Sequence, residues 1–201
     1  MIIKKIAKQC REHRTIISMF KDDTLWVGHY AAVYALSGLP DMTGEQIAVS
    51  FDFSDKQKKD TNYTEGETLN LPVEDEHEGE WLLKPPEDAV INGSDMKVFR
   101  HGGKILFCDA ETFEPLKDLQ ENVGLSFSIR KWGKTSLVAV RSGFFLVALI
   151  APMSFQTETL KDWCDKQRQL IVDIEDYVAQ LALEKDEDEV LDESQVTMEE
   201  A

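Results

Sequence analysis

The chain is poor in the residues from which disulfide-stapled and metal-bound proteins are built. Its three cysteines, Cys10, Cys108 and Cys164, are scattered and include no C-x-x-C pair. Its four histidines lie far apart in the sequence and include no H-x-x-x-H pair. These absences argue against a disulfide framework and a zinc site, and unpaired cysteines favour a cytoplasmic location. We therefore predict no metal and no cofactor.

An apolar run long enough to cross a membrane is also missing. The most apolar stretch, residues 137–152, is interrupted by Arg141, Ser142 and Gly143. Its longer uninterrupted part, residues 144–151, falls far below the roughly 20 residues that a spanning helix needs. The first residues, Met-Ile-Ile-Lys-Lys, lack the continuous apolar region of a secretory signal. The sequence thus predicts no membrane partner.

Catalytic and phosphate-binding signatures are incomplete. Residues 133–135, Gly-Lys-Thr, match the end of a phosphate-binding loop, but Ser128 stands where that motif needs its first glycine. Residues 60–71 begin like a calcium loop, but their last residue is a leucine where the bidentate glutamate belongs. One enzymatic alternative stays open, a small hydrolase or transferase that uses Cys108 with His101 across a predicted hairpin. We assign no catalytic residue beyond that alternative.

Basic residues are outnumbered, with 22 Lys and Arg against 38 Asp and Glu, for a net charge of -16. The charge is uneven, because residues 184–201 carry nine acids against Lys185, whereas residues 1–21 carry six bases against Glu12. This balance argues against nucleic-acid binding over the whole surface and leaves only a local basic face for it. We predict one domain over residues 1–183 and a disordered acidic tail over residues 184–201.

The spacing of apolar residues predicts the elements of this domain. Residues 2–11 form an amphipathic helix with a basic outer face, and residues 43–46, Thr-Gly-Glu-Gln, form a capping box that begins a second short helix. Residues 54–95 are polar and form either a mobile binding segment or an insertion with a short hairpin of strands 69–71 and 81–83. The predicted strands are residues 15–20, 24–28, 31–36, 96–100, 104–109, 125–130, 137–140 and 144–151.

The last predicted strand is the centre of the fold. Residues 144–151 have no polar face, so this strand should be central in its sheet and covered on both sides. Residues 125–130 alternate apolar with polar, as a half-exposed strand does. Residues 157–184 carry apolar positions at alternating spacings of four and three, which predicts a long C-terminal helix; we favour its docking on the sheet over dimerisation. The class is α+β: a mostly antiparallel sheet with two short helices and this long helix packed on it.

One predicted turn, residues 131–134, combines cations with an aromatic ring. Arg130, Lys131, Trp132 and Lys134 lie at or beside it. Such a cluster can stack on a base or on a partner's side chain, or it can be a plain exposed turn. We take these four residues as the candidate binding site.

The order of elements resembles a single domain of a DNA sliding clamp. Residues 125–129, 136–140 and 145–153 are similar in pattern to the last strands of bacterial clamps, which end in an apolar strand and a Pro-Met pair. The resemblance implies that Lys4, Lys8 and Arg11 line a DNA channel inside a ring oligomer. The chain departs from the family because it has one such domain instead of two or three, a scarcely visible first strand, and the extra predicted helix 157–184.

Taken together, these patterns predict a non-enzymatic, cytoplasmic, acidic protein-interaction module. Its negative charge suggests that it modulates a nucleic-acid-handling partner by mimicking a polyanion. The alternatives are a clamp-like domain that oligomerises around DNA, and the hydrolase or transferase that would use Cys108 and His101. A protein partner is expected in the first case, and an oligomer in the second.

Overall fold

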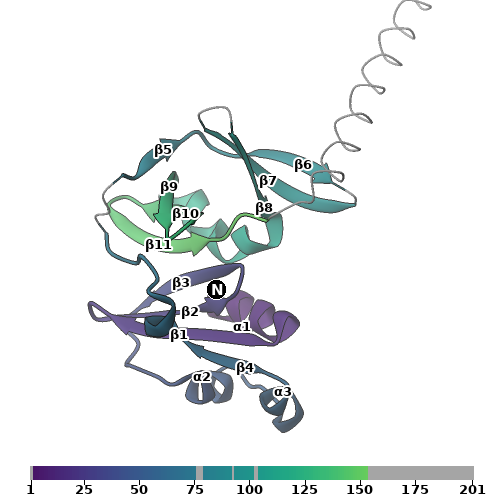
Figure 1. Cartoon of the computed structure of the whole chain (residues 1–201). Coiled ribbons are helices and arrows are strands. Elements are labelled where there is room, and N and C mark those ends of the chain that lie inside the picture. The colour runs from purple at the N-terminus through teal and green to yellow at the C-terminus, as the bar shows by residue number, and fades with distance from the viewer. Residues whose placement is uncertain (1, 76–78, 92, 102–103, 154–201) are drawn as a thin grey trace, which may run out of the picture. The chain divides into compact units, whose positions relative to one another are not determined.

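The computed structural model describes residues 2–75, 79–91, 93–101 and 104–153 (Figure 1). Eight strands form one sheet in the order β4-β1-β2-β3-β11-β10-β9-β5, and three form a second sheet in the order β6-β7-β8. The strands are β1 (Thr15–Lys21), β2 (Thr24–His29), β3 (Ala32–Ser37), β4 (Asn62–Glu65), β5 (Trp81–Leu83), β6 (Glu87–Ile91), β7 (Ser94–His101), β8 (Lys104–Asp109), β9 (Ser126–Trp132), β10 (Thr135–Ser142) and β11 (Phe145–Ile150). The helices are α1 (Ile2–His13), α2 (Gly44–Ser50), α3 (Asp55–Lys59), α4 (Gly66–Leu69) and α5 (Lys117–Asn122), with the 3-10 helix η1 (Ala110–Leu116).

The predicted class is confirmed as α+β with a mostly antiparallel sheet. Among the described strands, every pair is antiparallel except β1 with β4, which run parallel. The structure has the two expected short helices, α1 and α2, and adds α3, α4, α5 and η1. The predicted helix 157–184 and acidic tail 184–201 lie outside the described residues.

The first three strands form the predicted meander because two tight turns join them. Asp22 and Asp23 make the turn from β1 to β2 with φ values of 50° and 56°. Aspartate tolerates this left-handed region better than most residues. Gly28 is needed near the turn from β2 to β3, since a Cβ there would lie 2.0 Å from the carbonyl oxygen of Ala32. Both turns are thus local features of the sequence.

The last three strands form a second meander, with turns at Gly133 and Gly143. β11 pairs with β10 on one side and with β3 on the other, which confirms the central position predicted for it. The expected half-exposure of residues 125–130 is wrong, because Ser128 is 1% exposed and Arg130 has no exposed surface. Residues 72–75 and Glu80 cover the sheet face on which these two polar side chains lie.

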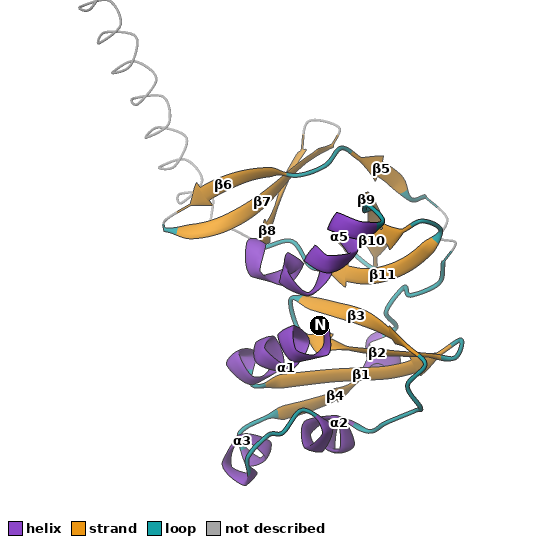
Figure 2. Ribbon diagram, turned by 180° about the vertical axis from the view of Figure 1, so that it is seen from behind, coloured by secondary structure: helices purple, strands orange, loops and turns teal. Residues whose placement is uncertain are grey.

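The chain contains the same arrangement twice, a helix followed by a three-stranded meander. α1 precedes β1 to β3, and α5, which continues η1, precedes β9 to β11 (Figure 2). The two meanders join edge to edge through β3 and β11, where Val33 pairs with Leu149. Ile6 from α1 and Phe113 from η1 share one apolar core, so both helical segments cover the same face of the sheet.

A second apolar core lies on the opposite face of the large sheet, where Leu71 and Val73 pack against Ile17, Met19 and strand residues of β10 and β11. The segment after α4 therefore supplies cover that the buried central strand requires. The hairpin alternative for residues 69–71 with 81–83 is wrong. Leu69 ends α4, and the strand that begins at Trp81 pairs with β9 instead.

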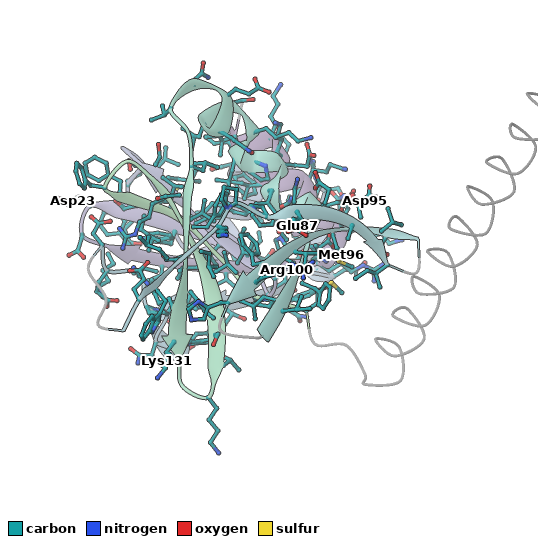
Figure 3. All side chains as sticks on the ribbon, turned by 90° about the horizontal axis from the view of Figure 1, so that it is seen from above. Asp23, Glu87, Asp95, Met96, Arg100 and Lys131 are labelled. Carbon is teal, nitrogen blue, oxygen red and sulfur yellow. The ribbon has the colours of Figure 1, made fainter. Side chains whose placement is uncertain are left out.

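The small sheet confirms the hairpin predicted for residues 96–109, with β6 added at the edge of β7. The ring of Phe99 lies 5.4 Å from that of Phe127 and 6.1 Å from that of Phe113, measured between centroids. This aromatic cluster joins the small sheet to β9 and η1. On the exposed side, the guanidinium of Arg100 lies 3.1 Å from the carboxylate of Glu87 (Figure 3).

Candidate binding groove

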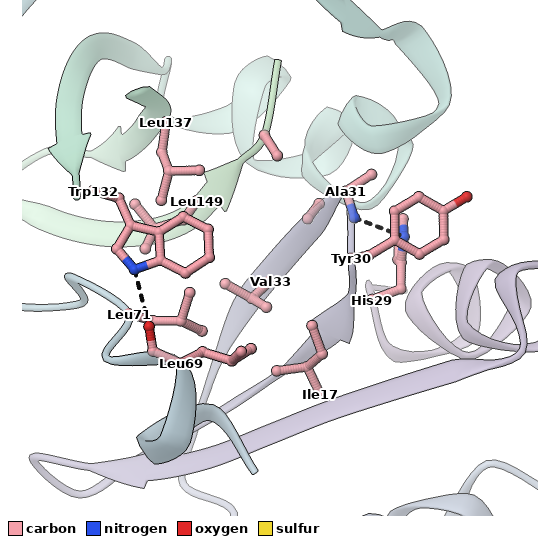
Figure 4. A pocket seen from close by; sticks show the side chains of 12 residues that line it. Ile17, His29, Tyr30, Ala31, Val33, Leu69, Leu71, Trp132, Leu137 and Leu149 are labelled. Atoms are coloured by element: carbon pink, nitrogen blue, oxygen red, sulfur yellow. Dashed lines mark hydrogen bonds between the residues drawn. The ribbon is translucent and has the colours of Figure 1, made fainter. Parts of the chain in front are cut away.

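An apolar groove of about 200 Å³ lies on the face of the large sheet that α1 and η1 leave open (Figure 4). Its floor consists of Ile17 from β1, Val33 from β3, Leu137 from β10 and Leu149 from β11. Alternate residues of a strand point to one face, and these four belong to the second core. The register that pairs Val33 with Leu149 brings the two meanders together beneath the groove.

One wall of the groove is the segment that follows α4. Leu69 and Leu71 line it, and the indole Nε1 of Trp132 donates to the carbonyl oxygens of Leu69 at 3.0 Å and Asn70 at 3.1 Å. Gly66 permits the close approach of α4 to β1, since a Cβ there would lie 2.7 Å from the Cβ of Met19. Trp132 thus holds this wall in place and contributes its ring to the lining.

A network of charges anchors the chain beyond this wall. Nη1 of Arg130 donates to the carbonyl oxygens of Pro72 at 2.5 Å and Glu74 at 2.7 Å, while Nη2 donates to Glu80 at 3.1 Å. Arg141 donates to the same carboxylate at 2.9 Å and also to the carbonyl oxygen of Asp75. Two arginines from β9 and β10 therefore fix residues 72–75 and Glu80 over the sheet.

The carboxylate of Glu80 is the acceptor shared by this network. Partial burial opposes ionisation, but hydrogen bonds from Arg141 and Ser128 and the charge of Arg130 outweigh it and lower the pKa of Glu80 to about 2. Nε of Arg130 is the one buried side-chain nitrogen or oxygen among the described residues without a hydrogen-bond partner. The network is thus ionised at neutral pH and nearly fully paired.

The end wall of the groove is the turn between β2 and β3. Tyr30 is 65% exposed at the mouth, and its hydroxyl lies 2.9 Å from Nδ1 of His13. His29 is buried behind it, with its ring stacked on that of His13 at 4.2 Å between centroids. Burial, and secondarily the charge of His13, lower the pKa of His29 to about 3, so this wall is uncharged at neutral pH.

The structure divides the predicted cluster at residues 130–134. Arg130 is buried in the charge network, and Trp132 lines the groove. Lys131 and Lys134 are exposed, Lys131 because it alternates with its neighbours to the opposite face of β9. Of the four predicted residues, only Trp132 therefore belongs to the groove.

The predicted basic face is present on α1 but has an acidic neighbour. Lys4 and Lys8 are exposed, and the guanidinium of Arg11 lies 5.7 Å from the centre of the Phe53 ring. Beside α1, the segment of η1 and α5 carries more acids than bases. Lys5 reaches across to Asp118 at 3.7 Å. The helical layer is thus basic on one helix and acidic on the other.

The arrangement of Cys108 and His101 does not fit a nucleophile with its base. Cys108 is fully buried, and burial, with a smaller contribution from Asp109, raises the pKa of its thiol to about 12. In the β7–β8 pair, Cys108 lies opposite Lys97, whereas His101 lies opposite Lys104. The two are four rungs apart along the ladder, about 14 Å at 3.4 Å per residue.

Within the described residues, no three His, Cys, Asp or Glu side chains gather closely enough to hold a metal ion. Likewise, none of the described helices is long and apolar enough to span a membrane.

No family model, curated protein or solved structure matches the chain. By its fold and its groove, the chain is an α+β protein in which a helix followed by a three-stranded meander occurs twice, with an apolar groove on the large sheet.

Sequence reasoning found most groove residues only as core residues. Ile17, Val33, Leu137 and Leu149 lie in predicted strands, but no sequence pattern indicates that a gap stays open above them. Tyr30 was missed altogether. The one available signal was a large aromatic side chain between two predicted apolar strands, where a turn residue is usually small or polar.

Proposed function

We propose that the chain is a non-enzymatic protein-interaction module whose groove takes apolar side chains of a partner. The observation that carries the proposal is the open apolar groove itself, with Trp132 and Tyr30 at its walls. Its volume of about 200 Å³ lies below the roughly 300–1,000 Å³ of sites that enclose small ligands. It suits one or two large side chains of a docked peptide better than a whole cofactor.

The charge of the chain favours a basic partner. Residues 155–201 contain 15 acids against four bases, so they carry -11 of the total charge of -16. An acidic chain attracts basic surfaces at long range and repels other acidic proteins. Proteins that handle nucleic acid have such basic surfaces, and the proposed partner is of that class, held by polyanion mimicry and by the groove.

Selection from a phage-displayed peptide library against the full chain tests the groove. We expect selected peptides to carry large apolar residues flanked by Lys or Arg. Ala151→Arg, which places a long charged side chain in the lining, should weaken these peptides at least tenfold. Tyr63→Ala, a change of a surface tyrosine outside the groove, is the control and should leave affinity unchanged. The proposal fails if no peptide is selected, or if Ala151→Arg leaves affinity intact.

A clamp-like domain is the second candidate, and the repeat of helix and meander favours it. Two helical segments on one sheet face, with Lys4, Lys8 and Arg11 along α1, suit a surface that follows a phosphate backbone. The acidic character of η1 and α5 on the same face weakens this candidate, because both segments would lie near the phosphates.

Fluorescence anisotropy with a labelled DNA duplex over a salt series tests the second candidate. The clamp-like function requires binding that weakens as salt rises, and Lys8→Glu should weaken it further. Lys134→Glu, a charge reversal at the exposed turn between β9 and β10, is the matched control. Absence of binding at low salt would remove this candidate without touching the first.

A further inference from the structure

β5 is a short end strand of the large sheet that presents exposed apolar side chains. It pairs with β9, and no described strand pairs with its other edge. Trp81 is 58% exposed and Leu82 is 82% exposed. Natural edge strands are usually protected by a lysine, a proline or a bulge, because free backbone groups there invite another strand. β5 is itself short, and Lys84, Pro85 and Pro86 follow it, so these protections leave only its three residues open to a second strand.

The residues around β5 are complementary to themselves. Residues 80–84 read Glu-Trp-Leu-Leu-Lys, an apolar centre with opposite charges at its two ends. When such a segment meets a second copy antiparallel about its midpoint, each acid faces a base and each apolar residue faces an apolar one. A two-fold interface needs this property, since the same surface is used by both chains.

We propose that two copies of the chain dimerise by antiparallel pairing of their β5 strands about a two-fold axis at Leu82. In this register Trp81 lies opposite the partner's Leu83, an aromatic and aliphatic cross-strand pair of a stabilising kind. Glu80 lies opposite the partner's Lys84. The two large sheets then become one continuous sheet.

The neighbouring residues limit the pairing to this short ribbon. Pro85 and Pro86 follow Lys84 directly, and proline has no backbone N–H to donate to a further rung. Glu80 is already held in place by Arg130 and Arg141, so its carboxylate occupies a defined position when Lys84 of the partner approaches. In the dimer the outer edge of β5 is paired on both chains, so a third chain cannot add to the sheet at that edge.

The proposal is independent of the groove, which lies over β1, β3, β10 and β11. A ribbon of about five residues per chain buries little area, so the dimer is of the weak, concentration-dependent type. Sedimentation of the full chain over a concentration series should therefore reveal a reversible change from the mass of one chain to twice that mass.

Leu82→Asp is the first test variant, because it places two carboxylates face to face on the axis. We expect it to sediment as a single chain at concentrations where the wild type is dimeric. Val123→Asp is the control, since Val123 is also largely exposed, at 65%, but follows α5. It should dimerise like the wild type. A wild type that stays monomeric at all concentrations, or a dimer that Leu82→Asp leaves intact, overturns the proposal.

Cysteine cross-linking tests the register in a Cys164→Ser background; Cys10 and Cys108 are buried. Leu82→Cys should form an intermolecular disulfide under mild oxidation, because directly opposed residues lie within the 4.4–6.8 Å Cα separation that a disulfide needs. Lys84→Cys should not, because its two copies would be four rungs apart, about 14 Å. Equal cross-linking of both variants, or none by Leu82→Cys, contradicts the proposed axis.

Discussion

At the scale of single residues, Arg130 is a charged side chain whose role is to hold another segment of the chain in place. Its side chain has no exposed surface, and its donors satisfy two backbone carbonyls and Glu80. Burying a charged group is costly unless it is paired and hydrogen-bonded, and here the two terminal nitrogens meet that condition, whereas Nε has no partner. The role of Arg130 is therefore to fix residues 72–74 and Glu80 over β9, next to the wall of the groove.

Glu80→Gln should lower the free energy of unfolding at pH 7 by about 3 kcal/mol, since it leaves Arg130 and Arg141 without their shared anion. Because folding lowers the pKa of Glu80 from 4.5 to about 2, its contribution is complete above pH 4.5 and is lost as the pH falls towards 2. Urea denaturation at pH 7 and pH 3 measures both effects. Glu87→Gln, which removes an exposed ion pair, should cost less than about 1 kcal/mol. Equal losses for the two variants would contradict the role given to Glu80.

Trp132→Phe should remove the hydrogen bonds to Leu69 and Asn70 while keeping an aromatic ring in the groove. We expect a loss of about 1 kcal/mol in the free energy of unfolding, the net value of a typical hydrogen bond. Faster amide hydrogen exchange in residues 66–71 should accompany it, because these residues lose an anchor. Unchanged exchange there would mean that Trp132 does not hold the wall.

At the scale of elements, β11 is central to the fold because it joins the two meanders into one sheet. Its pairing with β3 is the direct link between the first and last three strands of the large sheet. Leu149 belongs to the core beneath the groove, while Ile150 belongs to the core beneath the helices. A strand that contributes to both cores tolerates little loss of volume.

Leu149→Ala should reduce the free energy of unfolding by about 2–5 kcal/mol, because it leaves a cavity beneath the groove. Phe144→Ala, at the tip of the same hairpin, should change it by less than about 0.5 kcal/mol, since Phe144 is 91% exposed. Chemical denaturation of the two variants gives the comparison. A small effect of Leu149→Ala would mean that the groove can collapse to fill the gap.

At the scale of the whole molecule, half of the net negative charge can be removed without changing any residue of the two sheets. Deletion of residues 184–201 removes nine acids and one base, which changes the net charge from -16 to -8. If this charge steers a basic partner, the deletion should lower the association rate of the peptides selected above more than it raises their dissociation rate. Stopped-flow measurement over a salt series checks this, and the wild-type rate should fall more steeply with salt. Equal rates for both chains would remove the steering role.

The sequence by itself determined the local structure: both meanders, the capping box at Thr43, and the burial of residues 146 and 148–150 of β11, although Phe144 and Phe145 are exposed. Each depends on neighbours along the chain, namely strand periodicity, turn residues and a side chain that bonds a nearby backbone group. The pairing of β5 with β9 was not predictable, since three residues carry too little pattern to specify a partner. The burial of Ser128 and Arg130 was also missed, because polar alternation ordinarily indicates solvent.

Only the tertiary structure decided where the groove lies and which predicted residues share it. Trp132 was singled out in the sequence with three cations, yet it lies with Leu69, Leu71 and Val33, which are distant along the chain. The physical reason is that alternate side chains of a strand point to opposite faces, and the chain that covers each face arrives from elsewhere. Residues 69–75 and Glu80 turn one polar strand face into an interior and leave the groove open beside it.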